Sequence, residues 1–365
     1  MDELRVAIDV GPLHGHRTGV ALAVEQMVAA LGARPDVELL PYIVSFRSRP
    51  RPGEQRLPLP AALAHRLWSY LRWPPADHWL GRPSVVHGTN YVVPPARAAT
   101  VVSVYDCWFL AHPELAAPAV RRAGAVLRCS VADGAIVHAS SHATARRVAE
   151  LLATDRVEVV PLGPPPPPRA AEPRRPLAAV DGRPFVLSLG TMERRKNLPA
   201  LVAAFGDAAG ELPDVHLVLA GPPGDDAEAV SSATASMPQA VRQRVVLSGP
   251  VDDGQKAWLL ANAAALAYPS LDEGFGFPLL EAQKAGTPVV ATRAGSIAEV
   301  AGDGAELVDV GDRDALADAL VRVVRDEPRR RALVAAGTAN LTRFSWAATA
   351  EAMADLYRRA VERST

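Results

Sequence analysis

Short apolar runs alternate with helical stretches along this chain, and the alternation occurs twice. Amphipathic stretches such as Val20–Leu31 and Leu198–Gly210 lie between the apolar runs. Because parallel strands are joined by a crossover that is usually a helix, this order predicts an α/β fold with a parallel, doubly wound sheet in each half. The expected strands are Arg5–Val10, Val37–Val44, Val85–Val86, Thr100–Val104, Gly134–His138 and Val157–Pro161, then Phe185–Leu189, Val215–Ala220, Val245–Leu247, Ala265–Tyr268, Pro288–Ala291 and Ala305–Val308.

An unbroken proline run, Pro164–Pro168, separates the two halves. Proline-rich segments are semi-rigid spacers, and 365 residues exceed one typical core. We therefore expect a first domain at 1–165, a linker at 166–183 and a second domain at 184–345, with the last helix, 346–365, able to pack back on the first domain. Two Rossmann-like halves of this kind are expected to face a central cleft that holds the ligand.

Charge and cysteine content exclude several classes of protein. The chain has 39 basic and 40 acidic residues, so no broad basic surface for nucleic acid is expected. Cys107 and Cys129 are too few for a disulfide scaffold or a cysteine-rich metal site. There is no positively charged leader and no apolar run as long as a membrane span, which predicts a cytoplasmic protein.

The segment Asp272–Glu281 combines two glycines with carboxylates at either end of a loop and helix start. Pro278 suits a first helical turn, in which we also expect Glu281. Gly274 and Gly276 allow close approach of a ligand, whose oxygens free N–H groups can bind, while the carboxylates accept from hydroxyls. This layout suits a sugar nucleotide. The alternative is a plain loop-to-helix junction, with Glu281 only complementing the helix dipole.

A second polar segment, Gly190–Asn197, follows the first strand of the second half. Ligands of doubly wound sheets bind at such strand ends, and Arg195 with Lys196 can neutralise a diphosphate there. Lysine is rare in this chain, since 36 of the 39 basic residues are arginine and the lysines are only Lys196, Lys256 and Lys284. The alternative is a solvated charge run, although cations are unfavourable at a helix start.

With Gly295–Glu299, these segments resemble the group 1, family four retaining glycosyltransferases of GT-B fold, and most closely the O-antigen type mannosyltransferases. The resemblance implies that Arg195 and Lys196 stabilise the donor diphosphate and that Glu273 contacts the transferred sugar. Glu281 would hold the ribose, and the backbone around Val251 the base. Many relatives have arginine at Thr191, so Arg194 or Arg195 is expected to supply that charge. The donor-binding residues that the resemblance implies are Gly19, Thr191, Val251, Gly274, Phe275, Gly276, Phe277 and Glu281.

In the first half, Thr18–Val20 resembles a glycine loop that approaches the donor phosphates, and Gly19 is the expected contact. A simple turn before a helix would look the same. His87 and Asn90 follow a strand and could serve the acceptor, although His87 also fits a structural histidine. Tyr105 stands where the family usually has histidine, which removes a titratable group beside the sugar. Asp106 is either a sugar or acceptor ligand or a helix cap.

The segment Ala61–Leu80 holds three of the six tryptophans, with Leu63, Leu67 and Leu71 on one helical stripe. It could form an acceptor lid or an interfacial membrane helix. Since Arg66 and Arg72 supply little positive charge for anionic lipid, we expect the segment Ala61–Leu80 to pack on the first half.

The predicted function is transfer of a hexose from a nucleoside-diphosphate sugar to a hydroxyl, with retention and without metal or cofactor. GDP-mannose is the favoured donor, and dTDP- and UDP-sugars are alternatives. The acceptor would be a glycan, a lipid-linked group or a small molecule, with at most peripheral membrane contact. Alternatives are a nucleotide-sugar 2-epimerase or phosphorylase of the same fold and a non-catalytic sugar-nucleotide sensor. An NAD-dependent oxidoreductase is disfavoured because Gly11, Gly15 and Gly19 do not form the G-x-G-x-x-G pattern.

Overall fold

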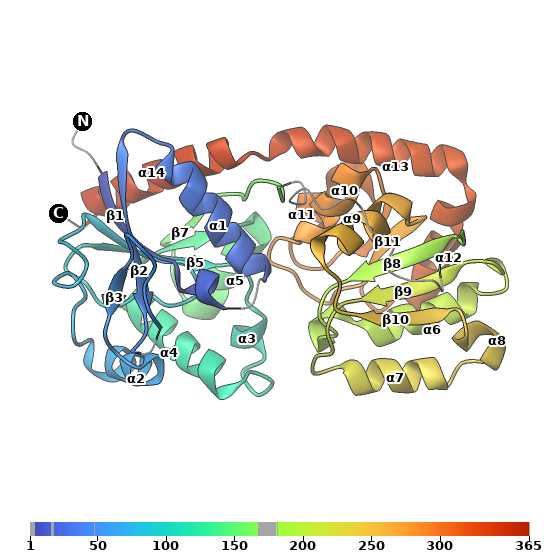
Figure 1. Ribbon diagram of the computed structural model, residues 1–365, viewed down its shortest axis with the longest axis horizontal. Helices are drawn as coiled ribbons and strands as arrows, with labels where there is room; N and C mark the ends of the chain where they lie inside the picture. The colour runs from blue at the N-terminus through green and yellow to red at the C-terminus, as the bar shows by residue number, and fades with distance from the viewer. Residues whose placement is uncertain (1–3, 16–17, 47, 167–179, 181, 365) are drawn as a thin grey trace. The chain divides into compact units, whose positions relative to one another are not determined.

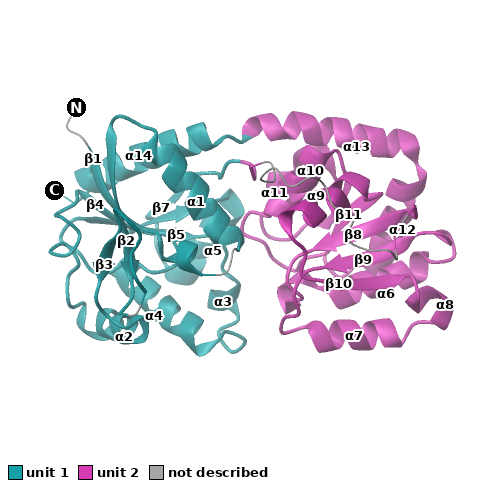
Figure 2. Cartoon of the chain, viewed as in Figure 1, with its two compact units in different colours: residues 1–163, 344–365 teal, residues 164–343 magenta. Residues whose placement is uncertain are grey.

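The computed structural model describes residues 4–15, 18–46, 48–166, 180 and 182–364. The chain divides into two compact units, residues 1–163 with 344–365 and residues 164–343 (Figure 2). Most of the expected linker at 166–183 lies outside the described residues. Within the described part of the chain, no helix is long and apolar enough to cross a membrane.

Unit 1 is built on a seven-stranded sheet whose strand pairs are all parallel (Figure 1). The strand order is β3-β2-β1-β4-β5-β6-β7. Its elements are β1 (Leu4–Asp9), η1 (Gly11–His14), α1 (Gly19–Gly32), β2 (Val37–Val44), β3 (Gln55–Leu57), α2 (Ala61–Leu71), β4 (Val85–Gly88), β5 (Ala99–Val104), α3 (Trp108–Ala111), α4 (Pro118–Ala132), β6 (Ile136–Ala139), α5 (His142–Leu152), β7 (Val157–Val159) and α14 (Trp346–Glu362).

Central strands of this sheet, such as β4 and β6, are buried at every residue because helices cover both faces. Side-chain caps define several helix starts. Thr18 accepts from the backbone of Ala21 at α1, and Ser141 accepts from that of Thr144 at α5. The C-terminal helix α14 packs against α1 and β5 within this unit.

Unit 2 contains a six-stranded parallel sheet of order β10-β9-β8-β11-β12-β13. Its elements are β8 (Phe185–Leu189), η3 (Arg194–Lys196), α6 (Leu198–Ala208), β9 (His216–Ala220), α7 (Ala227–Ala235), α8 (Gln239–Arg242), β10 (Val245–Gly249), α9 (Asp253–Asn262), β11 (Ala265–Tyr268), α10 (Phe277–Ala285), β12 (Val289–Thr292), α11 (Ile297–Ala301), η4 (Gly302–Gly304), β13 (Ala305–Val308), α12 (Arg313–Arg325), α13 (Glu327–Asn340) and η5 (Leu341–Arg343).

In both units the chain reverses its direction of travel across the sheet. The sequence moves from β1 outward to β3 and then returns to β4 beside β1, and it moves from β8 to β10 and returns to β11 beside β8. In open α/β sheets the carboxyl ends of the two strands at such a reversal form the ligand crevice. The ends of β1 and β4, and those of β8 and β11, are therefore where functional side chains are expected.

Candidate functional site

The loop after β8 carries the basic pair predicted from the sequence. Arg195 and Lys196 lie in η3, which ends at Asn197 in the left-handed region at φ 53°. This loop is tied to the end of β11, since the N–H of Leu271 donates to the carbonyl of Arg195 over 2.8 Å. Asn197 also donates its side-chain amide to the carbonyl of Pro269 over 3.3 Å. The two strand ends at the reversal are thus held together.

Glu273 is the centre of a buried ionic cluster with both of these cations. Its Oε2 lies 2.6 Å from Nη1 of Arg195, and its Oε1 lies 2.6 Å from Nζ of Lys196. All three side chains are largely buried, with 7% of Glu273, 16% of Arg195 and 13% of Lys196 exposed. The structure therefore brings together all three residues predicted as catalytic.

Burial and charge act in opposite directions on the ionisation of this cluster. Burial favours the neutral form of Glu273, but Lys196 and Arg195 together outweigh it and lower its pKa to about 2. Burial also lowers the pKa of Lys196 from its ordinary value, although the Glu273 carboxylate opposes that shift. Glu273 is thus held ionised at neutral pH, and two buried cations share one buried carboxylate.

Two further side chains of the cluster were not predicted from the sequence. Tyr268, the last residue of β11, accepts from Nζ of Lys196 over 2.8 Å, and its ring centroid lies 4.6 Å from that ammonium. Ser270 donates to Oε1 of Glu273 over 2.9 Å. Their position in the sequence could have identified them. Tyr268 ends a predicted strand and Ser270 follows it, immediately before the segment Asp272–Glu281.

Glycines in the loops allow the backbone to pack closely around Glu273. Gly295 has φ +51°, and a Cβ there would collide with the carbonyl oxygen of Glu273. The next residue, Ser296, donates its N–H to that same carbonyl over 2.8 Å. Gly276 has φ +89° at the start of α10, a conformation that side chains rarely adopt. These turns fix the loop that carries Glu273.

Glu281 is held by a partner that the sequence analysis did not assign. Pro278 lies in the first turn of α10 as predicted, but Glu281 is the fifth residue of the helix and therefore begins its second turn. The expectation that it lies in the first turn is wrong. Its Oε1 lies 2.7 Å from Nζ of Lys256 in α9, so a specific ion pair, and not only the helix dipole, orients this carboxylate.

The other predicted donor-binding residues of unit 2 lie on the same loops. Thr191 follows β8, and Val251 follows β10 two residues before α9. Gly274 and Phe275 are buried, and the ring of Phe275 meets that of Phe277 edge to face at 5.4 Å. All of them lie on the carboxyl-end side of the sheet, as predicted from their order along the chain.

In unit 1, Gly19 is exposed and is the first residue of α1, and Asn90 is exposed just after β4. Asp106 accepts from the N–H of Trp108 and from the hydroxyl of Tyr91, each over 3.1 Å. The N-cap residue of α3 is Cys107, and no side-chain cap hydrogen bond is present there, so Asp106 holds the turn just before the helix and is not its cap. Tyr105 is 7% exposed, and burial raises the pKa of its phenol.

His87 does not reach the surface of unit 1. Its ring is fully buried, with Nδ1 2.7 Å from the hydroxyl of Tyr357 and Nε2 2.8 Å from Oγ of Ser103. Ser103 lies 2.8 Å from Nδ1 of His138, whose Nε2 lies 3.0 Å from the carbonyl of Val160. With no contact available to an acceptor, His87 is corrected to a structural histidine that joins α14 to the sheet.

This row of hydrogen bonds has one consistent proton arrangement. Because the carbonyl of Val160 can only accept, Nε2 of His138 donates and its Nδ1 accepts from Ser103. Ser103 then accepts from Nε2 of His87, and Tyr357 donates to Nδ1 of His87. Every member is satisfied with both rings neutral, in line with the lowered pKa values that burial gives His87 and His138.

Asp9 is an unpredicted carboxylate at the strand reversal of unit 1. It ends β1, its Oδ1 accepts from the N–H of Gly11 over 2.8 Å, and its carbonyl accepts from Thr89 after β4. Burial raises the pKa of Asp9 to about 7, although the hydrogen bond from Gly11 opposes this. A carboxyl group of this kind can bind or deprotonate a hydroxyl near neutral pH.

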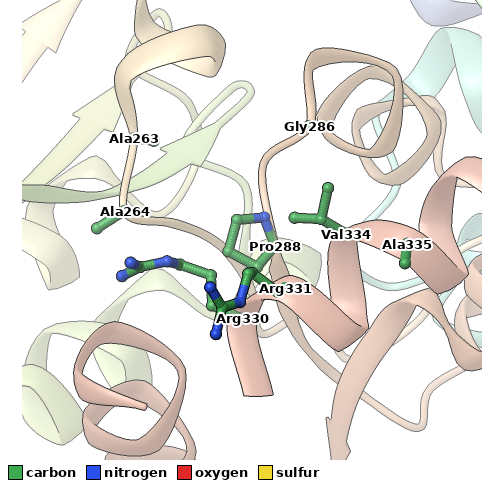
Figure 3. A pocket seen from close by; sticks show the side chains of 8 residues that line it. All are labelled: Ala263, Ala264, Gly286, Pro288, Arg330, Arg331, Val334 and Ala335. Carbon is green, nitrogen blue, oxygen red and sulfur yellow. The ribbon is translucent and has the colours of Figure 1, made fainter. Parts of the chain in front are cut away.

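Two further observations concern possible metal ligands and a cavity away from Glu273. Among the described residues, no group of three or more His, Cys, Asp or Glu side chains could hold a metal ion. A cavity of about 440 Å³ in unit 2 is lined by Ala263, Ala264, Gly286 and Pro288, with Arg330, Arg331, Val334 and Ala335 of α13 (Figure 3). It lies where β11 and β12 begin, at the opposite strand ends from Glu273, and contains none of the predicted site residues.

Residues 170–340 match the family model of "Glycosyl transferases group 1". Curated relatives include O-antigen chain mannosyltransferase B of Escherichia coli, 33% identical over 44% of this chain and 42% of its own length. D-inositol 3-phosphate glycosyltransferase of Xylanimonas cellulosilytica is 36% identical over 57% of this chain and 52% of its own length. Phosphatidyl-myo-inositol mannosyltransferase of Mycobacterium leprae is 35% identical over 47% of this chain and 46% of its own length. The chain thus spans about half the length of these relatives.

Solved structures match nearly the whole chain. A sucrose-phosphate synthase of Thermosynechococcus elongatus superposes with a TM-score of 0.73 over 98% of both chains at 19% identity. WaaG, a glycosyltransferase involved in lipopolysaccharide biosynthesis, superposes with a TM-score of 0.70 over 96% of this chain and 99% of its own at 15% identity. The predicted fold class and the resemblance to group 1 glycosyltransferases are confirmed.

Proposed function

We propose that this chain, a group 1 glycosyl transferase of GT-B fold, moves a hexose from a nucleoside-diphosphate sugar to a hydroxyl acceptor with retention and without a metal. The observation that carries the proposal is the buried cluster of Arg195, Lys196 and Glu273 at the carboxyl ends of β8 and β11. Cations at that edge suit a diphosphate, and an ionised carboxylate beside them suits sugar hydroxyls.

Each residue has a defined task in this proposal. Arg195 and Lys196 stabilise the negative charge that develops on the departing diphosphate, and Glu273 orients the sugar. Backbone N–H groups of Gly276 and Phe277 bind sugar or phosphate oxygens. Glu281, held by Lys256, accepts from the ribose hydroxyls. Thr191, Gly274 and Phe275 line the donor, and the backbone at Val251 receives the base.

The chemical step exchanges one bond at the anomeric carbon for another. The bond from this carbon to the phosphate oxygen breaks as the bond to the acceptor oxygen forms on the same face, and the acceptor proton passes to the leaving phosphate. The nucleoside diphosphate and the glycoside are the products. Catalysis then depends on position and electrostatics, and no separate general base is required. On the acceptor side we propose Asn90, Tyr105 and Asp106, with Gly19 toward the donor phosphates.

GDP-mannose is the donor we favour, because two of the three named relatives are mannosyltransferases. The acceptor would be a glycan, a lipid-linked group or a small molecule. Cys107 and Cys129 are the two cysteines of the sequence, and so low a cysteine content fits work in the cytoplasm.

The experiment follows release of nucleoside diphosphate from GDP-, UDP- and dTDP-sugars, with and without a panel of hydroxyl acceptors. We expect release that requires acceptor and is lost in Lys196→Ala and Glu273→Ala. Lys284→Ala is the matched control, because this lysine contacts the carbonyl of Pro165 away from the cluster. Transfer that persists in Lys196→Ala or Glu273→Ala contradicts the proposal.

The same assay separates the alternatives. An epimerase converts the donor without any acceptor, a phosphorylase requires inorganic phosphate, and a sensor binds nucleotide without turnover. Thermal unfolding with GDP, UDP and dTDP identifies the base, since a ligand that binds only the folded state raises the melting temperature.

A further inference from the structure

The cavity in unit 2 is large enough to hold a small organic molecule. Its volume is about 440 Å³, and ligand sites in proteins measure roughly 300–1,000 Å³. It is formed where the end of α9, the turn after α10 and one face of α13 meet, and it shares no residue with the proposed donor site. Figure 3 shows the side chains of Arg330 and Arg331 beside the ring of Pro288. We call this space the α13 cavity.

The backbone around the α13 cavity has few donors left for a ligand. The N–H groups of Ala263, Ala264 and Gly286 donate to carbonyl groups of α9, β8 and α10 respectively, over 3.0, 2.8 and 3.2 Å. Pro288 has no N–H. The two arginines are therefore the groups that can donate to a molecule in this space.

Both arginines of the α13 cavity can turn to an anion. Arg330 is half-buried, and among the described residues no carboxylate pairs with it. Its Nη1 donates to the carbonyl of Val324 over 3.2 Å, which leaves further N–H groups of the guanidinium for a ligand. Arg331 lies 3.2 Å from Glu327, but these side chains are 70% and 61% exposed. An ion pair so exposed is weak, so a ligand can compete for Arg331.

The lining of the α13 cavity restricts the chemistry of its ligand. Beside the two arginines it consists of alanine, glycine, proline and valine, with no acidic or amide side chain. A sugar ring would leave its hydroxyl groups unpaired against these residues, whereas an apolar body would be buried favourably. Two arginines match the double negative charge that a phosphate monoester approaches near neutral pH better than the single charge of a carboxylate.

We propose that the α13 cavity binds a small organic phosphate whose compact body is apolar. The phosphate pairs with Arg330 and Arg331, and the body lies against Pro288, Val334 and the alanines. This site is at the opposite strand ends from Glu273. It goes beyond the proposed transfer reaction and does not depend on it.

The test is calorimetric titration of the full chain with 1-naphthyl phosphate. We expect saturable binding at one site. Inorganic phosphate lacks the apolar body, 1-naphthol lacks the charge and 1-naphthoate has only one charge, so each should bind at least about tenfold more weakly. Equal affinity for any of these three compounds, or no saturable binding of 1-naphthyl phosphate, overturns the proposal.

Substitutions on α13 locate the binding. Arg330→Gln should lower the affinity for 1-naphthyl phosphate at least about tenfold, and Arg331→Gln by a smaller factor because its side chain is more exposed. Ala335→Trp fills the cavity from an exposed helix position and should weaken binding without changing the charge. The matched control is Arg242→Gln, at an exposed position in α8, which should bind like the unaltered chain.

Melting temperatures of the four variants establish that each is folded. Because Ala335 and Arg331 are exposed, these two variants should melt with the unaltered chain even if Arg330→Gln does not. Unchanged affinity in Arg330→Gln or in Ala335→Trp would place the bound phosphate elsewhere and overturn the proposal. A loss in Arg242→Gln as large as that in Arg330→Gln would show attraction by overall charge and would also overturn it.

Discussion

Lys196 donates to Glu273 over 2.6 Å and so joins the loop after β8 to the loop after β11, 77 residues further along the chain. The same carboxylate also holds Arg195. Because the contact spans the strand reversal of unit 2, the groups proposed to act on the donor also hold the two loops together. Changes to this cluster should therefore affect stability and activity at once.

Glu273→Gln should strongly destabilise unit 2. The amide keeps the shape of the side chain but removes its charge, which leaves the largely buried Lys196 without its ion-pair partner and Arg195 with the carboxylate of Glu193, 3.4 Å away. Breaking a buried pair in this way costs about 3–5 kcal/mol. The free energy of unfolding from urea denaturation measures the loss, and Glu228→Gln, at an exposed position in α7, is the control. Equal stability of the two variants would show that the ion pair does not hold the loops.

The buried histidines should make unit 1 sensitive to mild acid. Burial lowers the pKa of His138 to about 4, against an ordinary value of 6.5, and that of His87 falls too. At these two histidines the unfolded chain therefore binds more protons in that range, so their contribution to stability is full above about pH 6.5 and falls as the pH drops toward 4. Protonation of Asp9, whose pKa is raised to about 7, opposes this loss. Between about pH 7.5 and 5 the loss from His138 alone should be on the order of 2 kcal/mol.

Chemical denaturation at both pH values, compared between the unaltered chain and His138→Gln, checks this prediction. The variant is less stable at neutral pH, but its stability should change less on acidification. His78→Gln, at an exposed position, should keep the full pH dependence. If His138→Gln also keeps the full pH dependence, the loss of stability in acid comes from groups other than His138.

The sequence predicted most of the strands and the grouping of Arg195, Lys196 and Glu273 because both follow from local patterns. Buried parallel strands appear as apolar runs, and Arg195, Lys196 and Glu273 belong to motifs beside strand ends. Contacts between distant segments have no such local signal. The buried position of His87 depends on Tyr357, 270 residues away. The segment Ala61–Leu80 packs within unit 1 as expected, but Leu63 is exposed because Trp68 and α4 occupy the core.

Comparing Gly295→Ala with Gly311→Ala separates two causes of lost stability, the collision of an added Cβ with its neighbours and the strain of a left-handed backbone. Both glycines have positive φ, +51° and +87°, but only at Gly295 would a Cβ meet other atoms, including the carbonyl of Glu273. Gly311→Ala should cost roughly 1–2 kcal/mol from the left-handed conformation alone. Gly295→Ala should cost clearly more and abolish transfer, because the loop that carries Glu273 must move. Denaturation and the transfer assay measure both, and equal costs would refute the role of close packing at Gly295.

Lys256→Met should weaken nucleoside-diphosphate binding through its effect on Glu281. Methionine keeps much of the side-chain volume but removes the ammonium that lies 2.7 Å from the carboxylate. Calorimetric titration should show a loss of affinity smaller than that of Glu281→Ala, and the double variant should lose less than the sum of the two. Lys284→Met, which removes a lysine outside this pair, should bind normally. Additive losses would mean that Lys256 does not act through Glu281.

Tyr268→Phe tests whether the phenol supports the ionic cluster or only fills the core. The ring is 1% exposed and stays beneath the ammonium of Lys196, so the substitution removes only the hydroxyl that accepts from it. Tyr357→Phe is a matched control, since it removes a buried hydroxyl from the row at His87 in unit 1. Each variant should lose roughly 1 kcal/mol of stability. Only Tyr268→Phe should also lower the affinity for nucleoside diphosphate, because Lys196 loses one of the two groups that position it. Unchanged affinity in Tyr268→Phe would mean that Glu273 alone sets the position of Lys196.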